Sequence, residues 1–159
     1  MGARPDRTRR RRVRVRRLDH FGVDVADLAR AERFYTEVLG MKTEMHLPDQ
    51  VLLSYGDGNC ALFLRPNREP GGLDQIRNPL GKSHHAFEVA YADLVAAQAL
   101  FAVRGIPFHT PIDWGDHDCL YFLDPDGNLL ELVGYRERRA PARAGRAPGG
   151  EDRDAITAC

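Results

Sequence analysis

The chain repeats one pattern of apolar and polar residues at two places. Residues 18–40 and residues 83–105 each combine a short apolar stretch with a segment whose apolar side chains recur at helical spacing. Asp27 and Asp93 stand where the two helices should begin, and a glycine follows each last turn, so these residues are expected to cap the helices. A strand and a helix that occur twice predict a duplicated fold made of two similar modules.

Short strand-like segments follow each of the two helices. They are expected at residues 42–47, 51–55 and 60–64 in the first half and at residues 107–110, 119–123 and 129–133 in the second. An Asp-Gly-Asn turn precedes the last strand of each half. The predicted fold is therefore α+β, with two βαβββ modules at residues 17–65 and 83–135 that form a cupped mixed β-sheet, a half-barrel with the helices on the outside. Residues 66–82, which contain several prolines and glycines, are expected to link the modules.

The charges are unevenly distributed along a chain whose net charge is zero. Residues 1–17 have a net charge of +8, residues 18–135 of −10 and residues 136–159 of +2. Because nucleic-acid-binding domains carry basic residues on their folded surface, the acidic body argues against a nucleic-acid partner. We expect residues 1–16 to form a basic disordered arm and residues 136–159 a disordered tail.

The composition favours a cytoplasmic protein that does not enter a membrane. No apolar run reaches membrane-spanning length, and the basic N-terminus is not followed by the apolar segment that a secretory signal needs. The three cysteines show no paired metal-binding spacing, which is consistent with a reduced compartment.

Three side chains of types that bind divalent metals lie in short apolar stretches: His20, His84 and Glu131. A polar side chain in such a strand costs free energy unless a partner satisfies it. Strand side chains alternate between two faces, and this alternation places His84, rather than His85, at the position that matches His20 in the repeat. His85 is expected to pack near the helices, although the sequence leaves it open as the alternative ligand. The three residues together predict a metal site built by gene duplication.

A longer motif accompanies these residues. Residues 121–131 read Tyr-Phe-Leu-Asp-Pro-Asp-Gly-Asn-Leu-Leu-Glu. With this motif, the paired modules and the two strand histidines, the chain resembles the vicinal oxygen chelate superfamily, which includes glyoxalase I, extradiol dioxygenases, fosfomycin-resistance enzymes and bleomycin-binding proteins. The resemblance implies that His20, His84 and Glu131 hold a divalent metal ion, namely Fe2+, Mn2+, Zn2+ or Ni2+. It also implies a homodimer, because single-unit chains of this superfamily usually dimerise and often place the two histidine ligands on different subunits.

The number of ligands narrows the chemistry. Three protein ligands leave coordination positions open, so that two adjacent oxygens of a small substrate can chelate the ion. Glyoxalase I has a fourth ligand, a carboxylate, at the place where this chain has Leu62 or Phe63, and this difference argues against glyoxalase I. Residues 111–118 contain three acids and no lysine or arginine, which argues against a phosphonate substrate and therefore against a fosfomycin-modifying thiol transferase.

The sequence thus favours a metal-dependent enzyme, dioxygenase-like or lyase-like, with a small-molecule substrate. Tyr121 stands ten residues before Glu131, as a tyrosine does in the extradiol dioxygenases, and it is a candidate catalytic residue. Those enzymes also use nearby histidines for proton transfer, for which His117 is the first candidate and His109 the second. Trp114 is equally suited to stack on an aromatic substrate or to cover the core. The alternative function is metal-free sequestration of an antibiotic, as in the bleomycin-binding proteins.

Overall fold

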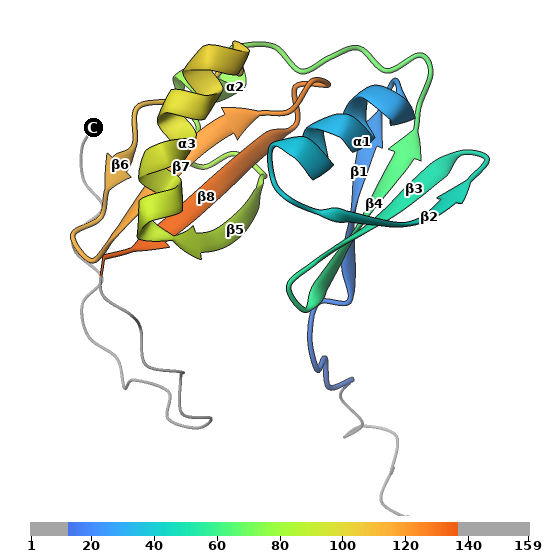
Figure 1. The fold of residues 1–159 in the computed structure, drawn as a ribbon, viewed down its shortest axis with the longest axis horizontal. Coiled ribbons are helices and arrows are strands. Elements are labelled where there is room, and N and C mark those ends of the chain that lie inside the picture. Colours follow the sequence, from blue (N-terminus) through green and yellow to red (C-terminus); the bar gives the residue numbers. More distant parts are fainter. Residues whose placement is uncertain (1–12, 137–159) are drawn as a thin grey trace, which may run out of the picture.

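The computed structural model describes residues 13–136 of the 159-residue chain. Residues 1–12 and 137–159, which hold most of the predicted arm and tail, lie outside the described part. Within residues 13–136 no helix is both long enough and apolar enough to cross a membrane. The elements, shown in Figure 1, are β1 (His20–Val25), α1 (Leu28–Glu37), β2 (Lys42–Leu47), β3 (Gln50–Tyr55), β4 (Gly58–Leu64), α2 (Asp74–Arg77), β5 (His85–Ala90), α3 (Tyr91–Arg104), β6 (Ile112–Asp113), β7 (His117–Leu123) and β8 (Leu129–Tyr135).

The strands form two open four-stranded sheets of the same topology. Their orders are β1-β4-β3-β2 and β5-β8-β7-β6, and the two halves lie side by side, each with its own helix (Figure 1). In each sheet the first strand runs parallel to the last strand of its module, whereas all other neighbours are antiparallel. The prediction of a duplicated α+β fold is therefore confirmed, with two mixed sheets in which β1 and β5 each form one of the two edges.

The two helices begin differently. The side chain of Asp27 accepts a hydrogen bond from the backbone N–H of Arg30, so the predicted cap of α1 is confirmed. The predicted cap of α3 is wrong. This helix follows β5 without a loop and begins at Tyr91, which places Asp93 inside its first turn. At its other end Gly105 has a φ of 65° and closes the helix as predicted.

One predicted strand in the second module is displaced. Residues 107–110 do not form a ladder, and only Phe108 makes an isolated bridge to Phe122. The edge strand forms instead at Ile112–Asp113, paired with β7. The predicted segment begins at Pro107 and is followed by Pro111. Because proline has no N–H, it cannot donate a hydrogen bond to a strand ladder. The apolar pattern from which the strand was predicted takes no account of the missing proline N–H groups.

The two modules share one hydrophobic core on the helix side of their sheets. The core joins buried residues of both halves, including Tyr35 of α1 and Leu94 of α3. Phe122 of β7 lies at the centre and is fully buried, with its ring centroid 4.7 Å from that of Phe101 in α3 and 6.4 Å from that of Phe34 in α1. Because this contact joins helices of different modules, the halves are expected to unfold together.

The turn between β7 and β8 fastens the second module to the first. Asp126, with 0% of its surface exposed, accepts hydrogen bonds from the backbone N–H of Ala26 at 2.9 Å and from Arg30 at 2.7 Å. Asp124 accepts one from the Tyr35 hydroxyl at 3.0 Å, and burial raises the pKa of this carboxyl. We call this set of contacts the turn clasp. It fixes the start of β8, the strand that carries Glu131.

Candidate metal centre

His84 and Glu131 meet on the second sheet. Glu131 lies in the middle of β8, between β5 and β7, and its side chain is only 6% exposed. His84 directly precedes β5, which runs parallel to β8, and its side chain is 26% exposed. The Nε2 atom of His84 lies 2.8 Å from Oε2 of Glu131. An imidazole and a nearly buried carboxylate are thereby placed in direct contact.

The hydrogen bond made by Nδ1 of His84 shows which of its two ring nitrogens carries the hydrogen. Nδ1 lies 2.7 Å from the carbonyl oxygen of Lys82, and because a carbonyl only accepts, Nδ1 carries the hydrogen. In the neutral imidazole Nε2 is then an acceptor, and it faces a carboxylate that also only accepts. Two acceptors in contact need a proton or a metal ion between or beside them. Adjacent ligands on one ion with bonds of about 2.1 Å lie about 3 Å apart, so the spacing of Nε2 and Oε2 fits a shared cation.

Two further side chains converge on the Glu131 carboxylate. Tyr121 is the cross-strand partner of Glu131, and its ring centroid lies 5.3 Å from that of His84. Burial raises the pKa of Tyr121, and the hydrogen bond and charge of Glu131 raise it further. Cys119, on the same face of β7, has its pKa raised to about 12, mainly by burial and then by hydrogen bonding to Glu131. Cys119 was not predicted as a site residue, although strand alternation places it, two residues before Tyr121, on the same face.

His20 is not part of this group within one chain. It lies on β1 in the first module, its side chain is 57% exposed, and its Nδ1 is 3.0 Å from Oδ2 of Asp19. Among residues 13–136, no three His, Cys, Asp or Glu side chains are close enough to hold a metal ion together. One copy of the chain therefore brings two of the three predicted ligands together and leaves the third apart.

The remaining histidines near the site face other partners. His85 packs its ring 4.4 Å from that of Phe21, on the face of β5 opposite to His84, and burial lowers its pKa. His117 shares its strand face with Tyr121, but four residues of extended chain separate the two, about 13 Å. His117 has its Nδ1 2.6 Å from Asp116 and its ring stacked on Trp114. The structure thus keeps His117 at the far end of the face that holds Glu131.

Sequence comparison identifies the family of this fold and site. Residues 17–132 match the family described as the Glyoxalase/Bleomycin resistance protein/Dioxygenase superfamily. The chain belongs to this superfamily, which is also known as the vicinal oxygen chelate superfamily. The match covers both modules, from the residues before β1 into β8, and it includes His20, His84, Tyr121 and Glu131.

Two curated relatives match most of this chain. Metapyrocatechase 2 of Cupriavidus necator is 29% identical over 147 residues, which cover 89% of this chain and 42% of the relative. Biphenyl-2,3-diol 1,2-dioxygenase 3 of Rhodococcus globerulus is 32% identical over 121 residues, which cover 73% of this chain and 62% of the relative. The chain therefore spans only about half the length of these two curated relatives.

A solved structure of a resistance protein has the same fold. The fosfomycin resistance protein of Listeria monocytogenes superposes with a TM-score of 0.64 at 15% identity, over 76% of this chain and 94% of that protein. At this identity the likeness concerns the fold alone. The description of the superfamily names glyoxalases, bleomycin resistance proteins and dioxygenases, and the fold by itself does not decide between these functions.

Proposed function

We propose that the chain is the subunit of a divalent-metal-dependent enzyme that binds a small substrate through two adjacent oxygens. In this proposal the ion is held by His84 and Glu131 of one copy and by His20 of a second copy. The observation that carries the proposal is the contact between His84 Nε2 and Glu131 Oε2, together with the hydrogen bond that fixes Nδ1 on the Lys82 carbonyl. A metal-binding imidazole characteristically donates its other N–H to such a carbonyl.

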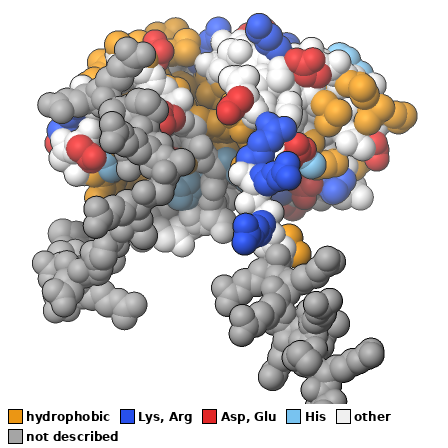
Figure 2. Space-filling view, turned by 90° about the horizontal axis from the view of Figure 1, so that it is seen from below, with side chains coloured by type: hydrophobic (Ala, Val, Ile, Leu, Met, Phe, Trp, Pro, Cys, Tyr) orange, Lys and Arg blue, Asp and Glu red, His pale blue; other side chains and the backbone are white. Residues whose placement is uncertain are grey.

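Several features support a second copy as the source of His20. Strand alternation assigns His20 and His84 to matching places in the repeat, yet within one chain the two do not share a cluster of metal-binding side chains. The strands that carry or follow them, β1 and β5, are both sheet edges with unpaired backbone groups. Hydrophobic side chains are visible on both halves in the view from below (Figure 2), and Met45, Leu73 and Trp114 are each at least half exposed. A twofold pairing of module one with module two would bring the ligands together at two equivalent sites.

In this proposal the residues around the ion have different roles. When bound, a divalent ion with open positions polarises the substrate oxygens and stabilises the negative charge that develops on them. Tyr121 remains protonated at neutral pH, because burial and Glu131 raise its pKa, so its hydroxyl is a hydrogen-bond donor beside the ion. The apolar neighbours Leu123 and Leu129 are buried on the same face and exclude water from this side of Glu131. Because one relative is named for a diol substrate, we favour a dioxygenase-type reaction on a diol.

Metal analysis tests the ligand assignment. We expect purified protein loaded with Fe2+ or Mn2+ to retain the ion after gel filtration. We expect the variants Glu131→Ala, His84→Ala and His20→Ala each to bind it at least about 10-fold more weakly, since even the loss of an outer partner of a ligand costs that much. His46→Ala is the matched control, because His46 is an exposed histidine paired with Glu32. Equal retention in all four variants would contradict the assignment.

Mixing two inactive variants tests the shared site. A dimer that combines a His20→Ala chain with a Glu131→Ala chain has one complete site and one site that lacks both residues. Unfolding and refolding an equal mixture should therefore restore about a quarter of the wild-type metal content. No restoration would show that all ligands come from one chain. A wild-type protein that binds no metal but captures a drug would overturn the enzyme proposal in favour of sequestration.

A further inference from the structure

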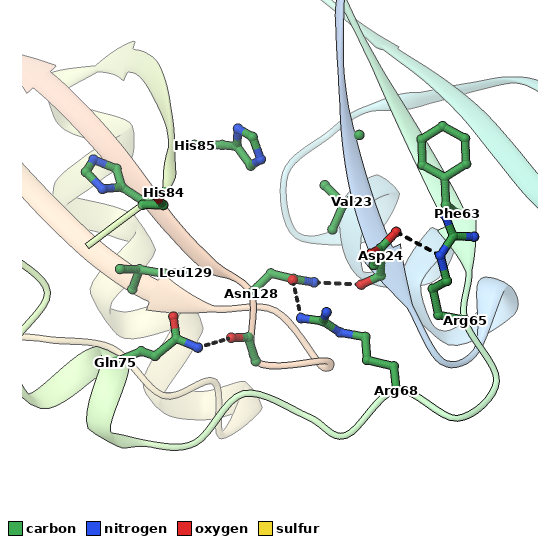
Figure 3. Close-up of a pocket in the computed structure, with 13 residues that line it drawn as sticks. Val23, Asp24, Phe63, Arg65, Arg68, Gln75, His84, His85, Asn128 and Leu129 are labelled. Carbon is green, nitrogen blue, oxygen red and sulfur yellow. Dashed lines mark hydrogen bonds and ion pairs between the residues drawn. The ribbon is translucent and has the colours of Figure 1, made fainter.

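A second polar site lies in the groove between the modules. The groove encloses a cavity of about 750 Å3, lined on one side by β1 and β4 and on the other by the linker, the start of β5 and the turn before β8. Its polar lining consists of one acid, Asp24, and of Arg65, Arg68, Gln75, Ser83, His84, His85 and Asn128. Figure 3 shows the two arginines reaching into this region from the chain that leaves β4. The predicted metal site does not account for them.

Arg68 is held in a fixed orientation. Its Nη2 donates to Oδ1 of Asn128 at 2.6 Å (Figure 3). Asn128 is itself oriented, because its Nδ2 donates to the carbonyl oxygen of Asp24 at 3.1 Å and to Oδ2 of Asp124 at 2.7 Å. The Nε of Arg68 is buried and has no hydrogen-bond partner. Because Nε is closed off from the cavity, the donors left for a ligand are the remaining hydrogens on the two terminal nitrogens of the guanidinium, of which one is used by Asn128.

Arg65 is held more loosely on the facing side. Its Nε lies 3.4 Å from Oδ1 of Asp24, and the two side chains are 53% and 46% exposed. Its guanidinium also lies over the ring of Phe63, with the carbon 5.7 Å from the ring centroid. An ion pair that is half exposed on both sides contributes little, so a second anion can compete with Asp24 for this arginine.

The linker that carries Arg68 is fastened to the second module. The backbone N–H of Gly71 donates to the carbonyl oxygen of Asp126 at 2.9 Å, and the Gln75 side chain donates to that of Gly127 at 3.2 Å. The crossing is so close that a Cβ on Gly71 would lie 2.3 Å from the Gly127 oxygen, which explains the glycine there. The arginine is therefore positioned before any ligand arrives.

We propose that this cavity binds the carboxylate of a small organic acid, with Arg68 and Arg65 as the binding residues and Asn128 as the positioning residue. The planar fork of a guanidinium matches a carboxylate through two parallel hydrogen bonds. Two arginines and one aspartate give the lining a net charge of +1, since a proton on His84 would be offset by the Glu131 carboxylate in contact with it. This charge balances a monoanion better than a phosphate that carries nearly two charges. His84 lines the same cavity, but the described hydrogen bonds of Arg65 and Arg68 do not involve His84 or Glu131, so the proposal goes beyond the metal-dependent function and does not depend on it.

Calorimetric or NMR titration of the full chain with benzoate and with benzamide tests the proposal. The two molecules have the same shape, but only benzoate is charged. Benzoate should bind and benzamide should not. In Arg68→Met the dissociation constant for benzoate should rise at least about 10-fold, as expected when hydrogen bonds to a charged group are lost. Arg77→Met is the matched control, because Arg77 is an exposed arginine on α2 outside the cavity, and it should bind benzoate as the wild type does.

A further variant and a second anion make the result decisive. Arg68→Lys keeps the charge and the fold but loses the planar fork, so it should also bind benzoate more weakly than the wild type. Inorganic phosphate should bind more weakly than benzoate. Equal binding of benzoate and benzamide, full affinity in Arg68→Lys, or tighter binding of phosphate would each overturn the proposal.

Discussion

Replacing Phe122 with alanine is expected to lower the free energy of unfolding by about 3–5 kcal/mol, the usual cost of removing a buried phenylalanine side chain. Phe122 is 0% exposed and belongs to the core that both modules share. Its ring contacts Phe101 of α3 on one side and Phe34 of α1 on the other, so the cavity left by alanine would open between the modules. Urea denaturation followed by circular dichroism measures the change.

The same experiment tests whether the modules unfold together. Because the core is continuous, the Phe122→Ala protein should still unfold in a single transition, shifted to lower urea. Val103→Ala serves as the control, since Val103 is 87% exposed and should change the stability by less than about 0.5 kcal/mol. Two separate transitions, or a loss below about 1 kcal/mol in Phe122→Ala, would contradict a shared core.

The repeat made the fold predictable because alternation and helical spacing are local properties of the chain. The alternation in β1 and β5 also separated His84 from His85, and the structure places these two side chains on opposite faces, His84 against Glu131 and His85 against Phe21. A pattern of period two is sufficient for that distinction, because it needs only the direction of each side chain.

The errors arose where two local signals compete. Asp93 was expected to cap α3, but the helix begins at Tyr91, directly after β5, and Asp93 lies in its first turn. Aspartate is a residue type that caps helices, but the sequence did not show where this helix begins. The strand expected at residues 107–110 has suitable apolar residues, but Pro107 at its start and Pro111 after its end cannot donate hydrogen bonds to a strand ladder. The edge strand forms at Ile112–Asp113 instead.

The candidate site was predictable only within one module. Tyr121 and Glu131 face each other in adjacent strands, a relation fixed by the short turn between β7 and β8. The separation of His20 from that pair depends on how one module packs against the other, which no local pattern encodes. The same holds for the turn clasp. From the sequence, Asp126 belongs to a turn, whereas in the structure it is buried against Ala26 and Arg30 of the first module.

Removing the carboxylate of Asp126 should therefore loosen the whole molecule rather than one turn. We expect Asp126→Ala to lower the free energy of unfolding by about 2–3 kcal/mol, because the Ala26 N–H would be left without an acceptor and Arg30 without its anion. This cost is smaller than the roughly 3–5 kcal/mol that breaking a buried ion pair usually costs, for two reasons. Arg30 is 42% exposed and can turn toward water, and Oδ2 of Asp126 is buried without a partner already in the native state.

An asparagine at the same position separates shape from charge. Asp126→Asn keeps an oxygen that can accept from the Ala26 N–H, loses the charge that pairs with Arg30, and puts an NH2 group where Oδ2 is buried without a partner, so it should cost less than alanine but more than zero. Asp74→Ala is the control, because Asp74 is 86% exposed and pairs only with Arg77 on the short helix α2, and its removal should leave the stability unchanged. If alanine at position 126 cost no more than alanine at position 74, the turn clasp would not hold the modules together, and the placement of β8 with Glu131 would have to rest on the hydrophobic core alone.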